Sequence, residues 1–415
     1  RRAFLAGAAL GVTTGSAGCL SRSTAVGLAP SADGPRSAAD QAETQFRGGP
    51  QRRGVFPEAT IPRAPAVEWV LPRVNTGEHT AAKASPIRTP DGDLVVPGDT
   101  GELRRLTTGG ELVWRTSVEP ARRGIHGTPA IANGTVYIGA YDGAFYAFDL
   151  ETGERIWRRR LGHAIGSSPA YHDGTLYIAV EYIGPDGSIF ALDPVTGRTN
   201  WVDRRPTDHP HSSIAIDRSA GWLVVGANDG NLYGWTYPGL DYRWSFATGR
   251  PIKGPIATAD GSAFFGSWDR TAYRVDLETG RADWAVDMDG LVMTGPSVEP
   301  ATQTVYVGSH DNRLYAIELE TGEVRWRFGT NGSLIGCPTV TRDHVLVGSY
   351  DGRCYAVRKD TGRERWSVAA NGRVTSTPLV IDGAVYFTDR ASRSYLQTGV
   401  GPTGGLYKVG SASGG

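Results

Sequence analysis

Lysines and histidines are the side chains whose placement could bind a ligand. Acidic and basic residues balance at 43 each, lysine is rare beside arginine, and the chain has 8 histidines. Several of these scarce residues fall in loops that precede short apolar strands at regular intervals: Lys83, His126, His163, His209, His211 and Lys253. If those strands converge on one channel, the loops ring its mouth and predict a site for an anion or a metal. The alternative is that loops simply collect polar residues.

The pair His209 and His211 places two imidazoles two residues apart, a spacing that can chelate a metal. No cysteine or carboxylate stands at a standard ligand spacing beside them, so we interpret the pair as a solvated loop and predict no metal site. We also predict no catalytic residues, because no nucleophile elbow, phosphate loop or zinc-protease helix is present. The balanced charge argues against a nucleic-acid partner.

Repeats must position these loops. The stretch 142–157, DGAFYAFDLETGERIW, reads as turn, strand, turn, strand, and it recurs at 186–201, 269–284, 311–326 and 351–366. Tryptophans count the units at intervals of 40 to 45 residues: Trp69, Trp114, Trp157, Trp201, Trp244, Trp284, Trp326 and Trp366. A repeat of this length indicates an array of supersecondary units. Four antiparallel strands per unit and no helical stretch predict an all-β fold, an eight-bladed β-propeller.

The two ends of the chain predict how the propeller closes. The first strand, Val67–Leu71, carries Trp69 but lacks three preceding strands, whereas the last unit has strands near 378–381, 385–388 and 406–409 but lacks its tryptophan strand. Joining them completes one blade from both ends and leaves no open sheet edge. We therefore expect the propeller to span residues 61–410, followed by a tail at 411–415.

The first residues have the character of a targeting signal. Arg1 and Arg2 precede a weakly apolar run that ends in Ser-Ala-Gly-Cys19, which resembles a twin-arginine signal with a lipobox. The resemblance implies a signal over 1–18, lipidation at Cys19 and a flexible tether and lead-in over 19–60. It also implies export and a membrane anchor on the extracytoplasmic side. The alternative is an uncleaved N-terminus with a chance cysteine.

The pattern Ala-x-Asp-x-x-Thr-Gly-x-x-x-Trp resembles the tryptophan-docking repeat of the pyrroloquinoline-quinone (PQQ)-type propellers over about residues 60–410. It is complete at 147–157 and 191–201, partial at 272–284, 316–326 and 356–366, and nearly absent before Trp114 and Trp244. The resemblance implies that the eight tryptophans fill gaps between neighbouring blades. It points to fold rather than function.

Quinoprotein dehydrogenases of this fold hold PQQ with a calcium cage, a catalytic aspartate and often adjacent cysteines. This sequence has no adjacent cysteines and few carboxylates in its channel loops. We therefore predict no cofactor, with PQQ and calcium as the alternative. The turn aspartates 142, 229, 269, 311 and 351 lie on the same face, where aspartate usually serves turn geometry.

In size, blade number and anchoring the chain resembles the BamB family of outer-membrane assembly lipoproteins. This implies a non-catalytic scaffold that binds another extracytoplasmic protein or a small ligand, and we expect a monomer. The other hypotheses are a compact quinoprotein dehydrogenase and an extracytoplasmic sensor. Two long hairpins, near 181–188 and 390–404, are candidate surfaces for a partner because insertions in repeat proteins often bind.

Overall fold

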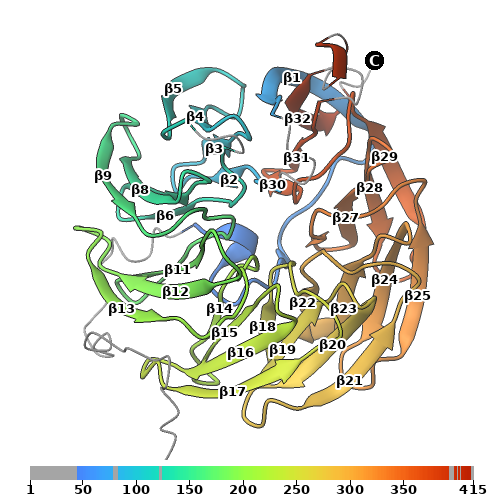
Figure 1. The fold of residues 1–415 in the computed structure, drawn as a ribbon. Coiled ribbons are helices and arrows are strands. Elements are labelled where there is room, and N and C mark those ends of the chain that lie inside the picture. The colour runs from blue at the N-terminus through green and yellow to red at the C-terminus, as the bar shows by residue number, and fades with distance from the viewer. Residues whose placement is uncertain are drawn as a thin grey trace, which may run out of the picture.

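Eight four-stranded antiparallel sheets surround a central axis in the computed structural model, which describes residues 44–77, 83–120, 124–391, 397–399, 401 and 403–412 (Figure 1). The arrangement confirms the predicted eight-bladed β-propeller. Two short 3-10 turns, at Phe46–Gly48 and Pro300–Thr302, accompany the strands. Arg1, Arg2 and Cys19 lie outside the described residues.

The strands of blades 1 to 4 follow in chain order from the axis outward. Blade 1 has β2 (Ile87–Arg88), β3 (Leu94–Pro97), β4 (Glu102–Leu106) and β5 (Leu112–Ser117). Blade 2 has β6 (Ala130–Ala132), β7 (Thr135–Gly139), β8 (Ala144–Asp149) and β9 (Arg155–Arg160). Blade 3 has β10 (Ala170–His172), β11 (Thr175–Glu181), β12 (Gly187–Leu192) and β13 (Thr199–Asp203). Blade 4 has β14 (Ala215–Asp217), β15 (Trp222–Gly226), β16 (Asn231–Thr236) and β17 (Tyr242–Ala247).

Blades 5 to 7 repeat this order. Blade 5 has β18 (Ala257–Ala259), β19 (Ser262–Gly266), β20 (Thr271–Asp276) and β21 (Ala282–Asp287). Blade 6 has β22 (Ser297–Glu299), β23 (Thr304–Gly308), β24 (Arg313–Glu318) and β25 (Val324–Gly329). Blade 7 has β26 (Thr339–Val340), β27 (His344–Gly348), β28 (Arg353–Arg358) and β29 (Glu364–Ala369).

Blade 8 joins the two ends of the chain, as predicted. Its strands are β30 (Leu379–Ile381), β31 (Ala384–Thr388), β32 (Gly404–Ser411) and β1 (Pro65–Asn75), in the spatial order β1-β32-β31-β30. β1 is longer than the five residues expected and pairs antiparallel with β32 from Pro65↔Ser411 to Asn75↔Gly404. This pairing closes the ring of sheets.

The hydrophobic core lies between blades rather than inside one layer. One cluster joins Leu103 and Trp114 of blade 1 to Val136 and Phe148 of blade 2. Another joins blade 2 to blade 3 in the same way. Because each blade buries its faces only against its neighbours, the ring is stable only when it is complete.

The repeat tryptophans bridge adjacent blades through their indole N–H groups. Six of the eight donate to a backbone carbonyl of the following blade: Trp114 to Leu150 at 2.8 Å, Trp157 to Pro194 at 3.0 Å, Trp244 to Leu277 at 2.7 Å, Trp284 to Leu319 at 2.9 Å, Trp326 to Lys359 at 2.8 Å and Trp366 to Pro62 at 2.9 Å. The first five acceptors lie in the turn between the third and fourth strands.

The two exceptions have a sequence cause. Among the described residues no acceptor is found for the indole N–H of Trp69 or Trp201. The turns opposite them precede Trp114 and Trp244, which are the two turns that lack the repeat motif. In the other turns the motif glycine lets the tryptophan ring approach the backbone. A Cβ on Gly153, whose φ is +73°, would lie only 2.7 Å from the Trp114 ring. The turn sequence therefore decides whether the preceding tryptophan gains a hydrogen bond.

Replacing Trp157 by Phe removes a hydrogen bond that the same change at Trp201 does not remove. Both indoles are buried, so the loss of packing is similar. We expect Trp157→Phe to lower the free energy of unfolding by about 1 kcal/mol more than Trp201→Phe. Urea denaturation of the two variants measures the difference, and equal losses would contradict the role of the N–H group.

A segment outside the repeats, residues 44–59 (the strap), lines the inner edges of six blades (Figure 1, blue). Main-chain N–H groups of Ile131, Ile216, Thr258, Val298 and Val340 donate to strap carbonyls at 2.8 to 3.0 Å. In blade 3, Tyr171 N–H donates to the side-chain oxygen of Gln45 at 2.9 Å. The strap therefore satisfies backbone groups that an inner edge strand leaves unpaired.

Two buried arginines fasten the strap by donating to carbonyl oxygens. Arg47 donates to the carbonyls of Arg52 at 2.8 Å, Gly295 at 2.9 Å and Pro296. Arg52 donates to those of Phe46 at 3.0 Å, Ile214 at 3.1 Å and Pro169 at 2.7 Å. Burial lowers the pKa of Arg52 to about 9, and the nearby positive charge of Arg47 adds to the effect.

Arg52→Ala should destabilise the propeller strongly, because it leaves several buried carbonyl oxygens without a donor. We expect a loss of about 3 kcal/mol or more in the free energy of unfolding. Its neighbour Arg53 is exposed and provides the matched control, Arg53→Ala, for which we expect little change. Guanidinium chloride denaturation compares the two. Similar stabilities would show that the strap does not depend on the arginine contacts.

Candidate functional site

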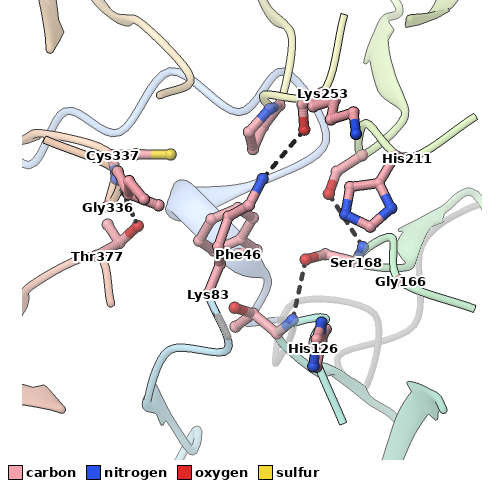
Figure 2. Close-up of a pocket in the computed structure, with 14 residues that line it drawn as sticks. Phe46, Lys83, His126, Gly166, Ser168, His211, Lys253, Gly336, Cys337 and Thr377 are labelled. Atoms are coloured by element: carbon pink, nitrogen blue, oxygen red, sulfur yellow. Dashed lines mark hydrogen bonds between the residues drawn. The ribbon is translucent and has the colours of Figure 1, made fainter. Parts of the chain in front are cut away.

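The loops that enter the innermost strands meet around a small cavity on the propeller axis. It has a volume of about 30 Å³, enough for about two water molecules. Lys83, His126, His211 and Lys253 line it, and Phe46 of the strap closes its other end (Figure 2). Four of the six residues predicted from the sequence therefore come together, each from a different blade.

The other two predicted residues do not reach the cavity. His163 is exposed, and its backbone N–H donates to the carbonyl of Glu181 at 2.8 Å. The His209 ring lies with Nε2 at 3.0 Å from the carbonyls of both Tyr182 and Gly184. It thereby supports the long hairpin between β11 and β12, which is a structural role.

Two lysine ammonium groups dominate the charge of the cavity. Lys83 Nζ donates to the backbone carbonyl of Lys253 at 3.1 Å, and Lys253 Nζ lies 4.0 Å from the centre of the Trp268 ring. Burial lowers the pKa of Lys83 to about 8; the charges of Cys337 and Glu181 oppose this shift and that of Lys253 adds to it. Within the described residues, neither ammonium is within ion-pair distance of a carboxylate.

The two histidines of the cavity differ in their surroundings. His211 Nδ1 donates to the Glu181 carboxylate at 2.8 Å, so this anion is already engaged. His126 is buried and contacts Tyr141, with 4.3 Å between ring centres and ring planes inclined at 50°. Tyr141 lies in the hairpin between β7 and β8, the second and third strands of the same blade.

One residue per blade forms a set, here called the collar, that lies beside the entering loops, and sequence reasoning missed it. Each member lies at or just after the end of the second strand, and in seven blades its N–H donates to a carbonyl of the entering loop of the same blade. The collar consists of Asp99, Tyr141, Glu181, Asn228, Trp268, His310, Tyr350 and Arg390. Its side chains contact the entering loops: besides Tyr141, Glu181 and Trp268, Tyr350 lies 4.8 Å from the Arg373 guanidinium.

A signal for the collar exists in the repeats. In Gly-Ala/Ser-x-Asp at 139–142, 226–229, 266–269, 308–311 and 348–351, only the third position varies freely. The aspartate that follows is structural, as interpreted: Asp142, Asp229, Asp269, Asp311 and Asp351 each accept from the hydroxyl of a tyrosine four residues later, at 2.5 to 2.8 Å. Variation inside a constant frame thus marks the residues that contact the entering loops.

The donor set of the cavity does not suit a calcium ion. Calcium takes carboxylate and carbonyl oxygens, whereas the charged groups here are two ammonium groups and a carboxylate engaged by His211. The collar carboxylate Asp99 is buried and lies 3.6 Å from the Arg390 guanidinium. No group of three or more His, Cys, Asp or Glu side chains in the described ranges could hold a metal ion. We derive no chemistry through a quinone or calcium at this site.

Lys83→Met should stabilise the protein at pH 7 in buffer without small anions, because it removes a charge that burial disfavours. The unfolded chain binds more protons than the folded one between pH 8 and the ordinary lysine value, so wild-type stability rises over that window. The advantage of the variant should therefore shrink above pH 8. Chemical denaturation at pH 7 and pH 9.5 measures it, with Lys408→Met, whose ammonium pairs with Glu68 at 2.8 Å, as the control. A variant less stable than wild type at pH 7 would contradict the cost of this charge.

Comparison with known proteins gives partial sequence matches and a broad fold match. BamB from Yersinia pestis is 26% identical over 178 residues, 40% of this chain and 43% of that protein. A 1-butanol dehydrogenase (cytochrome c) from Thauera butanivorans is 27% identical over 201 residues, 43% of this chain and 28% of that protein. The chain thus matches less than half the length of these relatives.

Among solved structures, the quinohemoprotein alcohol dehydrogenase from Comamonas testosteroni superposes with a TM-score of 0.75 at 16% identity, covering 91% of this chain and 82% of that one. At that identity the match describes the fold alone. None of the helices in the described ranges has the length and apolar character needed to cross a bilayer. The profile of one family matches residues 99–233, 207–333 and 321–399, most of the propeller. The chain belongs to that family, described as outer membrane protein assembly factor BamB.

Proposed function

We propose that this protein is a non-catalytic, extracytoplasmic scaffold that binds a partner protein on the face where the channel opens. Its family membership supports a role in protein assembly, since the family is named for outer membrane protein assembly. The proposal includes export through the Arg1-Arg2 signal and lipidation at Cys19, both beyond the described residues.

The observation that carries this proposal is an exposed apolar side chain on a fixed hairpin. Ile183, at the tip of the hairpin between β11 and β12, is 85% exposed. His209 holds that tip through the carbonyls of Tyr182 and Gly184. An apolar group presented on a support that is already ordered loses little entropy on binding, which favours a protein contact.

A photo-crosslinking amino acid at position 183 tests this proposal in the native host. The matched control is position 195, because Val195 is also an exposed apolar residue, at 77%, but lies in the turn between β12 and β13 on the opposite face. We expect a specific crosslinked partner from position 183 and none from position 195. Equal labelling from both positions, or none from position 183, would contradict a partner on the channel face.

A quinoprotein dehydrogenase is the second candidate, and the likeness to 1-butanol dehydrogenase favours it. The cationic cavity and the engaged Glu181 oppose it, because they offer calcium few oxygen ligands. Purified protein incubated with PQQ and calcium distinguishes the two functions. Alcohol-dependent reduction of an electron-accepting dye would support the dehydrogenase, and its absence would leave the scaffold.

A further inference from the structure

A ring of hydrogen bonds links neighbouring blades at the level of the axial cavity. It runs through the residue that precedes the first strand by two positions in each blade. The backbone N–H of one blade donates to the side chain of the next: Ser85 to Thr128 at 3.1 Å, Thr128 to Ser168 at 2.9 Å, Ser168 to Ser213 at 3.0 Å, Gly295 to Cys337 at 3.2 Å, Cys337 to Thr377 at 3.2 Å and Thr377 to Ser85 at 2.9 Å. Six blade junctions are joined in this way.

The ring is interrupted at blade 5, where Pro255 has neither an N–H nor a hydroxyl. The N–H of Ser213 therefore lacks the side-chain acceptor that its counterparts have, and no other acceptor is found for it among the described residues. Ser213 and Pro255 both line the cavity. A backbone donor is thus left available at the cavity wall, which is costly unless something accepts from it.

The hydroxyl groups of the ring add further donors. The oxygens of Thr128, Ser168, Ser213 and Thr377 each accept one backbone N–H, and no acceptor for their O–H protons is found in the described part of the chain. All four residues line the cavity. Since a hydroxyl that accepts can still donate, the wall presents O–H groups to whatever occupies the space.

The charges of the cavity agree with these donors. Lys83 and Lys253 both line it, and their ammonium groups contact a carbonyl and an aromatic ring rather than a carboxylate. Glu181 and Asp208 are near enough to affect the pKa of Lys253, which burial lowers, but neither forms an ion pair with it. Two lysines for which the described residues provide no carboxylate partner, several hydroxyls and a backbone N–H line or adjoin a volume of about 30 Å³.

We propose that the axial cavity is an oxyanion-binding site that takes a single carboxylate or phosphate group. Lys83 and Lys253 supply the charge, while Ser213 N–H and the ring hydroxyls bind the oxygens. Hydrogen bonds to an ionised acceptor are stronger than hydrogen bonds between two neutral groups, so both the lysines and the uncharged donors would bind an anion well. The cavity has room for about two water molecules, which matches the two oxygens of a carboxylate, whereas a phosphate fits only if the surrounding loops move apart. A multi-ring quinone is too large, so the site differs from a cofactor pocket. The proposal does not depend on the scaffold function.

Thermal unfolding with added anions tests the site at constant ionic strength and pH 7. The probes are sodium acetate, sodium phosphate and sodium chloride, with PQQ as a fourth arm. We expect acetate or phosphate to raise Tm progressively with concentration, as a ligand that binds the folded state must. Chloride at the same ionic strength should not reproduce the shift. Whichever of acetate and phosphate acts identifies the source of the oxyanion.

Two variants assign the effect to the cavity. Lys83→Met and Lys253→Met should each weaken the binding at least about ten-fold, because each loses a charge-assisted contact. Lys408→Met, whose ammonium pairs with Glu68 on the outer strands, should retain wild-type binding. Because Lys83→Met is expected to remain folded and more stable, a lost shift in that variant cannot reflect unfolding.

Three results would overturn the proposal: no shift with acetate or phosphate, an equal shift with chloride, or a shift that survives in Lys83→Met and Lys253→Met. A shift with PQQ alone would also overturn it and would favour the dehydrogenase. Crosslinking from position 183 in the Lys83→Met background reports on the scaffold separately. A partner captured from position 183, together with no anion-induced shift in the Tm of the wild-type protein, would reject the oxyanion site and keep the scaffold.

Discussion

The inner edge of each blade is the constraint on which this structure depends. Eight short strands face the axis, and each presents backbone N–H and C=O groups that need partners. The repeats cannot supply those partners, because every strand of the repeat is already used within its own blade. A segment from outside the repeats provides partners in six of the eight blades, and two arginines hold this segment by donating hydrogen bonds to carbonyl oxygens. The strap is therefore part of the core.

The same solution shapes the candidate site. Phe46 follows directly from the strap residues that pair with blades 2 and 3, and its ring closes one end of the axial cavity. Without it the propeller would have an open channel, in which water would screen the lysine charges. With it, Lys83 lies in surroundings dry enough to lower its pKa. A charge kept at such a cost to stability is typical of functional rather than structural positions.

The fold could be predicted in detail because its signals are local and repeated. Asn133-Gly134 and Asp173-Gly174, for example, take the positive φ values that their hairpin turns require. Trp69 and Trp201, whose indole N–H groups find no acceptor in the described part of the chain, face turns that lack the motif. The contacts of the strap could not be predicted this way. Arg47 and Gly295 are joined by one guanidinium across 248 residues, and no periodic pattern encodes that contact.

For the candidate site, the sequence predicted which loops meet but not which of their side chains point into the cavity. Topology places every entering loop at the channel mouth, so Lys83, His126, His211 and Lys253 were found together. Side-chain direction depends on the dihedral angles of each loop, which is why His163 and His209 turn away. The collar and the hydroxyl ring were missed because they lie one residue from more conspicuous aspartates and prolines. The signal for the collar was variation at a single position between constant neighbours, whereas the ring position is mostly serine or threonine.

The shared blade also sets the order in which the molecule can be completed. The strap and β1 leave the ribosome before blades 1 to 7, yet β1 pairs with β32, which is synthesised after all of these blades. During synthesis the backbone groups of β1 therefore stay unpaired until β32 is made. Most of the strap likewise stays unpaired until the blades that it lines are made. A chain that stops before β32 has every tryptophan of the repeat but no closed ring. Closure of the ring therefore requires that the chain has been synthesised through β32.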